Sequence, residues 1–434
     1  MSKAANWTAE SVAQLDQEDP LAKFRELFVI ADPEICYLDG NSLGRLPKAT
    51  IDRVNSFLTD EWGKELVDGW SHWIDQAQTA GDLLAKTALG AGPGQTLVCD
   101  TTSVNFYQLC VAAIKANPGR KKIIIDSANF PTDRYIVQGI AKQFNLELIT
   151  LNSDGMGGPG AVEIASEYEE IALAALEPHL TDDVALLTLQ AVNYRSGVKQ
   201  DIKAITDLAR KKGIYVVWDC SHAIGSVELN FEQNGVDLAV GCTYKYGNSG
   251  PGSPAWLYVR KSLQEKLQVP IQGWFAQDKQ FEMGAFFEPT NQIRGFQIAS
   301  PSIIGIRAVE VAFQMIGEAS IEKINQKASQ GTQLMVDLYD QWLVDIGFTL
   351  ATPRDAHKRG GHIIIQHQDA KQIAYALRKL KKVIPDYREP GAIRLGISPL
   401  PTSYSEVFEG FKRLKELVES GDYKNVSESS SRVT

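Results

Sequence analysis

Six short apolar runs between residues 121 and 260 are the feature of this sequence that most constrains its fold. The runs are KKIIID (121–126), ELITLN (147–152), ALLTLQAV (185–192), YVVWD (215–219), DLAVGCT (237–243) and AWLYV (255–259). Helix-like segments separate the earlier runs, at 132–144, 163–180 and 200–213. Strands that stay apolar, without polar residues at alternate positions, are typical of a mostly parallel sheet that helices cover on both faces. The sequence therefore predicts an α/β fold, in which a ligand lies beyond the carboxyl ends of the strands.

A second, smaller domain is predicted after about residue 305, where the pattern changes. A long helical stretch comes first, and two strand-like segments, GGHIIIQH and AIRLGIS, then alternate with helices near 370–382 and at 404–419. This order predicts an α+β domain. The polar end of the chain, NVSESSSRVT, is predicted to be disordered. The predicted division is an N-terminal segment 1–75 that is part of the small domain, a large cofactor-binding domain 76–304, a small domain 305–422 and a disordered tail 423–434.

Charge and cysteine content argue against several classes of protein. The net charge is -9 over 434 residues, whereas binding to nucleic-acid phosphates requires a basic face. No apolar run approaches the ~18 residues that would suggest a membrane span, and the first twenty residues lack an apolar signal core. The five cysteines are scattered and show no paired metal-ligand spacing. The sequence thus predicts a cytoplasmic protein with reduced thiols, no metal site, and no nucleic-acid or membrane partner.

Polar residues gather where the predicted strands end. Asp219 closes YVVWD, His222 follows it in WDCSH, and Lys245 follows DLAVGCT in the stretch GCTYKYGNSG. Thr102 and Ser103 precede the helix-like VNFYQLCVAAIKA, where free backbone donors and the helix dipole favour a phosphate. A pyridoxal phosphate enzyme needs this set: a phosphate site, a lysine for the Schiff base, and a carboxylate that keeps the pyridine nitrogen protonated. The combination predicts pyridoxal 5'-phosphate as the cofactor.

Each of these residues has an ordinary structural explanation when it is taken alone. Asp219 could cap a helix after a strand, and Thr102 and Ser103 could form a simple N-cap. Lys245 could be a surface residue, and His222 a hydrogen-bonded structural histidine. Their shared order along one α/β pattern favours the functional interpretation, because that conjunction is far rarer than any of its parts.

Several longer motifs resemble those of the kynureninase family and occur in the family's order. They are YLDGNSLGRLP (37–47), TTSVN (101–105), NFPTDRY (129–135), VNYRSG (192–197), WDCSHAIGSVEL (218–229), YKYGNSGPGSPA (244–255), GWF (273–275) and AIRLGISPLP (392–401). The resemblance covers nearly the whole chain. It implies the fold type I architecture of pyridoxal phosphate enzymes, of the class V aminotransferase kind, with a large mostly parallel domain and a smaller α+β domain.

The resemblance implies a role for five residues around the cofactor ring. Lys245 would carry the Schiff base and shuttle the α-proton. Asp219 would pair with the pyridine nitrogen, and Phe130 would stack on the ring with Asp133 near it. His222 would lie beside the cofactor.

The resemblance also implies a shared site in a homodimer. Thr102, Ser103 and Tyr244 would hold the phosphate, and Tyr244 would protonate the substrate carbon. Trp274 would reach the phosphate region from the partner subunit. Taken alone, Phe130 and Trp274 could be ordinary core aromatics, and Tyr244 could simply fill the end of a strand.

Three further residues would contact the amino-acid substrate. Arg394 would clamp the α-carboxylate, because a guanidinium offers a bidentate geometry that lysine lacks. His72 and Ser300 would lie near the substrate side chain, and Ser300 also near the cofactor. Taken alone, Arg394 could be an exposed ion-pair partner.

The reaction that the resemblance implies is hydrolysis of the Cβ–Cγ bond of L-kynurenine or 3-hydroxy-L-kynurenine. The products would be L-alanine and anthranilate or 3-hydroxyanthranilate, a step of tryptophan catabolism by the kynurenine pathway towards NAD biosynthesis. The sequence departs from the family's usual motif after GWF, where Ala276 and Gln277 replace a Gly-His pair, and Ser300 is smaller than the usual Asn or Thr. These changes allow an alternative in which the substrate is a modified kynurenine or another γ-keto amino acid.

Other functions on a similar chain are less well supported. A cysteine desulfurase would need a reactive cysteine in the small domain, whereas all five cysteines precede residue 243. A β-lyase or an aminotransferase of the same fold stays open. A non-catalytic protein would not be expected to keep both Asp219 and Lys245, and a nicotinamide-dependent dehydrogenase would need an early GxGxxG turn.

Overall fold

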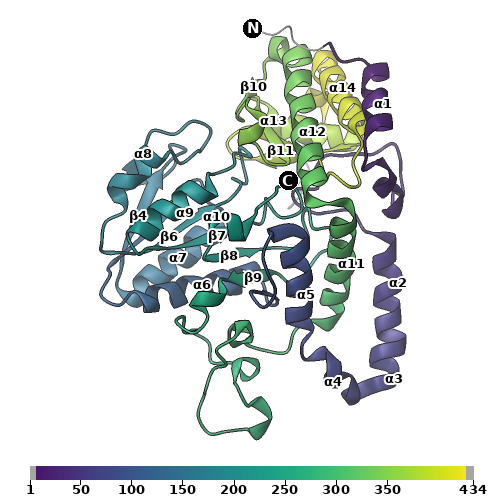
Figure 1. Ribbon diagram of the computed structural model, residues 1–434. Coiled ribbons are helices and arrows are strands. Elements are labelled where there is room, and N and C mark those ends of the chain that lie inside the picture. The colour runs from purple at the N-terminus through teal and green to yellow at the C-terminus, as the bar shows by residue number, and fades with distance from the viewer. Residues whose placement is uncertain (1–5, 427–434) are drawn as a thin grey trace.

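The predicted apolar runs form the centre of an eight-stranded sheet in the computed structural model, which describes residues 6–426 (Figure 1). The strand order is β2-β9-β8-β7-β6-β3-β4-β5, and β9 alone runs antiparallel to its neighbours β8 and β2. The bounds are β2 Thr96–Val98, β3 Lys122–Asp126, β4 Glu147–Asn152, β5 Val162–Glu163, β6 Val184–Gln190, β7 Tyr215–Asp219, β8 Leu238–Gly241 and β9 Trp256–Val259. The prediction of a mostly parallel sheet is confirmed.

The helices that connect successive parallel strands pack on this sheet. The helices α6 (Thr102–Ala116) and α7 (Pro131–Phe144) contact each other, and α6 lies against β6 to β9. The helix α9 (Ile202–Lys211) contacts β7, where the Trp218 indole donates to the Thr206 hydroxyl at 3.1 Å. The short helix α10 (Phe231–Asn234) precedes β8.

The predicted helix at 163–180 is wrong. This segment contains β5, an irregular loop, the one-turn helix α8 (Leu173–Leu176) and a 3₁₀ turn. Tyr168 and Glu169 have φ angles of 54° and 69°, a left-handed conformation that an α-helix cannot include. Glu169 is buried beside Arg195, so tertiary contacts of the loop override its local helical propensity.

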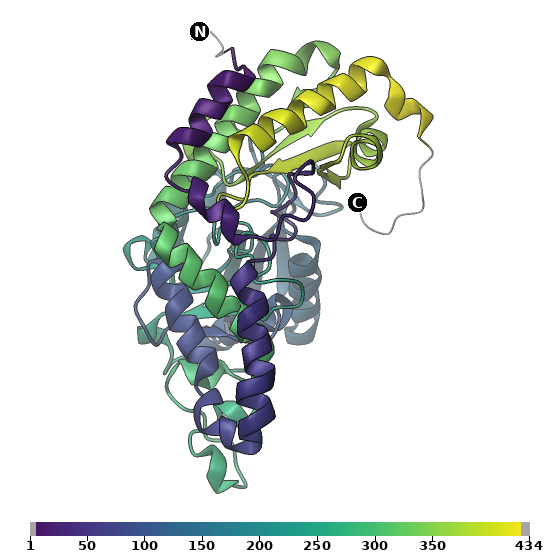
Figure 2. The same ribbon diagram turned by 90° about the vertical axis from the view of Figure 1, so that its right-hand side faces the viewer.

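The small domain is built on a four-stranded antiparallel sheet in the order β10-β11-β14-β13. Its strands are β10 Thr349–Leu350, β11 His362–Gln366, β13 Asp386–Arg388 and β14 Ala392–Gly396, and its helices are α12 Ile321–Trp342, α13 Ala370–Leu380 and α14 Tyr404–Ser420. The N-terminal helix α1 (Ala9–Glu18) packs on α14, as Figure 2 shows from the side. A two-stranded pair of β1 (Cys36–Tyr37) and β12 (Val383–Ile384) joins the N-terminal segment to this domain.

The N-terminal segment does not belong wholly to the small domain, which corrects the predicted division at residue 75. Val12, Cys36 and Leu38 lie in the hydrophobic core of the small domain, whereas Phe24, Phe57 and their neighbours lie in the core of the large domain. The helices of this region that follow are α2 Lys48–Ser56, α3 Gly63–Glu65, α4 Trp70–Trp73 and α5 Gln76–Leu84. The chain therefore crosses between the domains within its first 60 residues.

The boundary near residue 305 is also corrected by packing. The helix α11 (Ile303–Ala319) contacts α2 and α5, and its buried face is part of the core of the large domain. The core of the small domain begins on α12 instead. At the other end, Tyr423 is buried and donates to Asp369 at 3.0 Å, so residues 423–426 are not a disordered tail, and residues 427–434 lie outside the described part of the chain.

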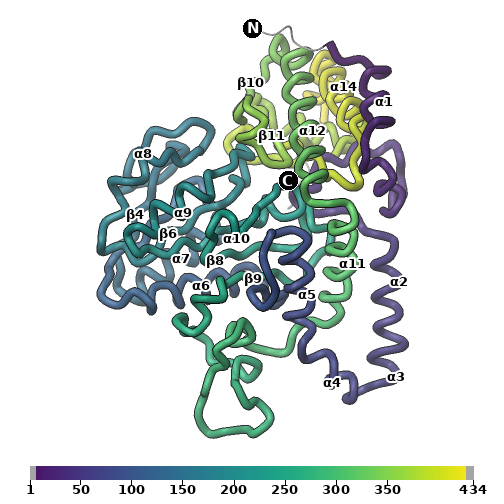
Figure 3. Tube along the Cα trace, in the orientation of Figure 1, coloured from purple at the N-terminus to yellow at the C-terminus, as the bar shows by residue number. Residues whose placement is uncertain are grey.

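A long excursion between β9 and α11 leaves the body of the large domain (Figure 3). It contains four short 3₁₀ turns, at Lys261–Leu263, Trp274–Ala276, Gln280–Glu282 and Ile293–Phe296. Phe281 and Phe286 on it are 68% and 84% exposed. Within residues 6–426, no helix combines the length and apolar character that would be needed to cross a bilayer.

We expect Ile306→Ala to destabilise the folded protein by about 2–5 kcal/mol, because it removes a fully buried side chain from the contact of α11 with the large domain. Urea unfolding followed by tryptophan fluorescence measures this change. The control is Ile51→Ala on α2, where the side chain is 45% exposed and the change should stay within about 0.5 kcal/mol. Equal effects in the two variants would contradict the packing of α11.

Candidate active site

A cavity of about 440 Å³ lies at the carboxyl ends of the central parallel strands, between the large sheet and the small domain. Nine of the predicted site residues line it, from five separate stretches of the chain: Thr102, Ser103, Phe130, Asp133, Asp219, His222, Tyr244, Lys245 and Arg394. The position agrees with the rule that parallel sheets bind ligands at the carboxyl ends of their strands.

Lys245 stands in the turn that follows β8, with its amine directed at the cavity. Its Nζ lies 2.8 Å from Nε2 of His222 and 5.7 Å from the centre of the Phe130 ring. Removal from water lowers the pKa of Lys245, and the positive charges of Arg394 and Arg388 add to this effect. The amine is thus biased towards the neutral form, which is the form that acts as a nucleophile or a base.

His222 is buried and neutral beside this amine. Burial, followed by the charge of Lys245, holds the pKa of His222 well below its ordinary value. Its Nδ1 has no hydrogen-bond partner among the described residues. A polar atom left in this state is expected to meet a ligand or water, because a buried unpaired nitrogen is costly.

Two buried carboxyl groups face the cavity from the large domain. Asp219 ends β7, and its Oδ1 accepts from the Ser221 amide at 2.9 Å and the Ser221 hydroxyl at 2.6 Å. Asp133 stands in the first turn of α7, and burial, reinforced by Asp219, raises its pKa well above the ordinary range. Oδ2 of Asp133 has no partner among the described residues. Asp133 with its raised pKa keeps its proton and can donate a hydrogen bond, whereas Asp219 at the end of β7 is placed to pair with a protonated ring nitrogen.

The N-terminus of α6 supplies the site for an anion. Thr101 caps the helix by accepting from the Val104 amide at 3.3 Å. The first amides of a helix have no intrahelical partner, and the helix dipole adds partial positive charge there. The hydroxyl groups of Thr102, Ser103 and Ser253 line the cavity at this end. The arrangement is that of a phosphate site.

Arg394 reaches the cavity from β14 of the small domain and is 1% exposed. Its guanidinium donates to the Tyr194 carbonyl, to the Ser42 hydroxyl at 2.8 Å and to Asp386 Oδ2 at 2.5 Å. The Asn41 amide oxygen accepts from Nε at 2.7 Å. The small domain thus brings a firmly held cation to a cavity that the large domain otherwise forms.

Three predicted site residues lie outside this cavity in the same chain. Trp274 is 45% exposed and donates to the Gln280 carbonyl at 2.8 Å. His72 is exposed and lies 2.6 Å from Glu65. Ser300 lines a separate apolar groove. These three residues share an exposed flank of the large domain, where the rings of Trp70, Phe275 and Trp274 follow one another in contact.

The unusual pair after GWF also lies away from the cavity. Ala276 is fully buried in the excursion, and the Gln277 side chain accepts from the Glu288 amide at 2.7 Å. Within one chain, neither side chain lines the cavity.

Sequence reasoning missed several residues that line the cavity. They are Ser42, Asp100, Thr132, Gln190, Ser221, Ser253 and Arg388. Ser221 lies inside the quoted motif around Asp219, and Ser42 inside YLDGNSLGRLP, so the motifs held a signal for both. Arg388 gave none, because it lies just outside the quoted motif AIRLGISPLP, in a strand of only three residues.

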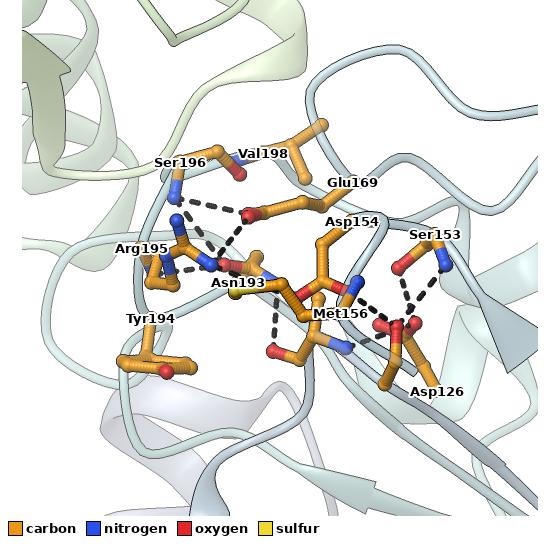
Figure 4. A network of polar contacts seen from close by, with 12 residues as sticks. Asp126, Ser153, Asp154, Met156, Glu169, Asn193, Tyr194, Arg195, Ser196 and Val198 are labelled. Carbon is orange, nitrogen blue, oxygen red and sulfur yellow. Dashed lines mark hydrogen bonds and ion pairs between the residues drawn. The ribbon is translucent and has the colours of Figure 1, made fainter. Parts of the chain in front are cut away.

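A buried polar network supports the turn that carries Tyr194 (Figure 4). Arg195 lies between Asp154 and Glu169, with its Nη1 at 3.5 Å and 3.7 Å from their oxygens. Oδ1 of Asn193 accepts from the Arg195 amide at 2.8 Å. The Tyr194 ring meets Phe130 edge to face, with centroids 5.3 Å apart. The network therefore holds both an aromatic neighbour of the cavity and the carbonyl that receives Arg394.

Sequence comparison identifies the family to which this site belongs. The chain is 34% identical to a kynureninase from Pseudomonas fluorescens, over 95% of this chain and 96% of the relative. It is 36% identical to a kynureninase from Geobacillus thermodenitrificans, over 98% of each. The chain belongs to the kynureninase family. The family of the kynureninase C-terminal domain matches residues 324–414, so the small domain seen here carries the C-terminal domain of kynureninases.

Solved structures agree with the fold expected of a kynureninase. A cysteine desulfurase from Thermococcus onnurineus aligns with a TM-score of 0.75 at 16% identity, over 96% of this chain and 100% of that one. The cystine C–S lyase C-DES, solved with cysteine persulfide, aligns with a TM-score of 0.74 at 17% identity, over 88% and 98%. These are pyridoxal phosphate enzymes of fold type I, and a C-DES mutant was solved with glycine covalently linked to its pyridoxal phosphate. The predicted fold class is confirmed.

Pyridoxal phosphate is the cofactor of this kynureninase family member, and the residues of the cavity fit it. The unpartnered Oδ2 of Asp133 and Nδ1 of His222 are buried polar atoms that a bound group would satisfy. The start of α6 suits the phosphate, and the Lys245 amine, whose pKa burial lowers, suits the aldehyde. The ring, the phosphate and the aldehyde of pyridoxal phosphate could thus each be bound by residues of this one cavity.

We expect Asp126→Asn in the polar network to change the pH dependence of stability. Burial raises the pKa of Asp126 to about 7, far above its value in the unfolded chain. Between about pH 4 and pH 7 the folded protein binds a proton at Asp126 that the unfolded chain has lost. The free energy of unfolding of the wild type therefore falls as the pH rises through this range. From pH 5 to pH 8 the variant should gain roughly 2 kcal/mol relative to the wild type.

Thermal unfolding of both proteins at pH 5 and pH 8 measures this effect. The matched control is Asp52→Asn, because Asp52 is exposed on α2. The inference would be contradicted if the difference in stability between Asp126→Asn and the wild type were the same at pH 5 and pH 8. The Asp126 carboxyl group would then not have a raised pKa.

Proposed function

We propose that this protein is a kynureninase that hydrolyses the Cβ–Cγ bond of L-kynurenine or 3-hydroxy-L-kynurenine. The products would be L-alanine and anthranilate or 3-hydroxyanthranilate. Its kynureninase relatives match over nearly the whole of both chains. The observation that carries the proposal is the Lys245 amine, biased towards its neutral form and 2.8 Å from His222 in a cavity with an anion site and two carboxyl groups.

Five residues of the large domain would hold the cofactor in this proposal. Bound pyridoxal phosphate supplies a protonated aromatic ring that accepts the electrons of a bond broken beside it. Asp219 would keep the ring nitrogen protonated, and Phe130 would cover the ring face with Asp133 near it. Thr102 and Ser103 would bind the phosphate at the start of α6.

Lys245 and Tyr244 would move the protons of the reaction. The Lys245 amine would hold the cofactor and would take the α-proton of the substrate. Cys242 and then burial raise the pKa of Tyr244 above its ordinary value, so the phenol keeps its proton at neutral pH. Tyr244 is therefore suited to donate a proton to Cβ after the bond to Cγ has broken.

His222 and Arg394 would position these groups and the substrate. His222 lies beside the amine and, as a neutral imidazole, can accept or donate a hydrogen bond without adding charge. Arg394 would bind the substrate α-carboxylate. Closing the cavity with the small domain would also exclude water from the cofactor.

The active assembly would be a homodimer in which each site takes residues from both subunits. The groove beside Ser300 carries exposed apolar side chains, among them Trp62 at 53%, Leu66 at 63% and Val67 at 75%. Leu66 also has a φ of 53°, a conformation that a bulky residue rarely adopts away from a functional or contact site. An apolar face of this extent is typical of a protein–protein interface.

This interface would explain why three predicted site residues lie outside the cavity of their own chain. Trp274, His72 and Ser300 all lie on the exposed flank that would meet the partner. Trp274 and Ser300 would then reach the cofactor region of the partner, and His72 its substrate. We also propose that the protein works in the reducing cytoplasm, which its five buried, unpaired cysteines support.

The direct test is turnover by protein that has been reconstituted with pyridoxal phosphate. We expect equimolar alanine and anthranilate from L-kynurenine, or the hydroxylated product from the 3-hydroxy substrate. Lys245→Ala should keep the fold, lose the visible absorbance of the covalently held cofactor, and lose turnover by at least about 10²-fold. The exposed Lys64→Ala is the control. Full activity in Lys245→Ala would refute the central role of this amine.

The shared site is tested by mixing two variants. We expect Lys245→Ala and Trp274→Ala to be inactive alone, since each subunit would lend Trp274 to its partner. Random exchange of subunits should then restore about a quarter of the sites, because half of the dimers are mixed and each has one intact site.

Subunit exchange can be blocked as a control. Adding Val67→Asp to both proteins places a charge in the apolar groove, and it should yield monomers in sedimentation and no recovery. Recovery without dimers, or stable dimers without recovery, would contradict a shared site.

A further inference from the structure

The face of the small sheet that turns towards the cavity carries three charged side chains. Arg394 on β14 pairs directly with Asp386 on β13, and Arg388 follows two residues after Asp386. Alternate residues of a strand share a face, so all three lie on one side. Ile393 and Tyr387, on the opposite side, belong to the hydrophobic core. The sheet thus presents two arginines and one carboxylate to the same space.

Arg394 has little hydrogen-bonding capacity left for a substrate. A guanidinium has five N–H groups. Its Nε donates to Asn41, Nη2 has Ser42 and Asp386 as acceptors, and Nη1 donates to the Tyr194 carbonyl. Four of the five are thereby engaged, and one N–H on Nη1 remains. A bidentate clamp needs two parallel N–H groups, so Arg394 alone provides only half of one.

Arg388 lines the same cavity and has the missing donors. Its Nε donates to Asp386 at 2.8 Å. Among the described residues, none accepts from its two terminal nitrogens. The side chain is 29% exposed, and its guanidinium lies 5.9 Å from the centre of the Tyr194 ring. The Arg388 guanidinium is therefore held through Nε by Asp386 and by the Tyr194 ring, while its two terminal nitrogens stay accessible.

The charges of this cluster also favour an anion. Arg388 and Arg394 share the single carboxylate of Asp386, which is 2% exposed. Asp39 also interacts with Arg394 and with Arg378, so the cluster contains three arginines and two carboxyl groups. The phosphate site lies at a different place, at the start of α6, so this second cationic site is available to a second anionic group.

We propose that Arg388 forms, together with Arg394, the binding site for the substrate α-carboxylate. The inference rests on the proposed function for the identity of the substrate. Arg394 contributes its remaining N–H, and Arg388 contributes the terminal pair of its guanidinium. Arg388 is then a specificity-determining residue that selects amino acids with a free carboxylate. Its ion pair with Asp386 fixes its direction before the substrate arrives.

The test uses L-alanine as a probe, because it carries the amine and the carboxylate without the aromatic ring. Its dissociation constant is read from the absorbance change of the holoenzyme. In Arg388→Met we expect weaker binding of L-alanine by about 10- to 100-fold, as for the loss of hydrogen bonds to a charged group. Binding of L-alaninamide, which lacks the carboxylate, should change less than threefold. For kynurenine, KM should rise by a similar factor and kcat should change little.

Two further variants complete the design. Arg388→Lys keeps the charge and loses the fork, so it should recover part of the affinity. Arg354→Met removes an exposed arginine that pairs with Asp340 and should bind both probes as the wild type does. If Arg388→Met fails to fold, the same comparison in Arg388→Lys decides the question.

The outcomes separate the inference from the proposed function. Equal weakening for L-alanine and L-alaninamide, or no weakening for either, would overturn the role of Arg388 in carboxylate binding. A wild-type holoenzyme that binds L-alanine through Arg388 but leaves kynurenine uncleaved would refute the proposed substrate and support the inference. Failure of the wild type to bind L-alanine at all would overturn both.

Discussion

The active site depends on keeping one lysine amine away from bulk water. Lys245 lies in a turn at the end of β8, and desolvation lowers its pKa although the carboxyl group of Asp219 is nearby. Such a placement is costly unless the surrounding groups compensate it. His222 does so through a 2.8 Å contact that leaves the imidazole neutral. The Lys245 amine, the two carboxyl groups and the start of α6 all line this one cavity.

The site needs both domains, although most of it belongs to one. The large sheet brings Asp219, Lys245 and the start of α6 together, because neighbouring parallel strands end at the same edge. The small domain adds the arginines of β13 and β14. The polar network behind Tyr194 links the two, because Tyr194 packs on Phe130 and its carbonyl receives Arg394. The turn at Tyr194 therefore contacts Phe130 of the large domain and Arg394 of the small domain, on two sides of the cavity.

The strand pattern was sufficient to predict the central sheet, and the reason is burial. The strands β3, β6, β7 and β8 are covered on both faces, so nearly every position is apolar and the signal is strong. The segment 163–180 was not predictable in the same way. Its course is set by the buried contact of Glu169 with Arg195, a residue from a distant turn. The division into domains failed at α11 for a related reason, since an amphipathic helix does not reveal which core it joins.

The sequence by itself determined the fold class and the family, and it predicted the residues around the cofactor, because these depend on local patterns and on motifs with a fixed order. Only the tertiary structure decided which of the predicted residues share a cavity. It separated Trp274, His72 and Ser300 from the other nine, and it added Arg388 through the pairing of β13 with β14. The physical reason is that a side chain reaches this cavity only if its strand has the right register and if the small domain packs against the large one in the right orientation. Both are set by contacts between residues far apart in the chain, which no local pattern records.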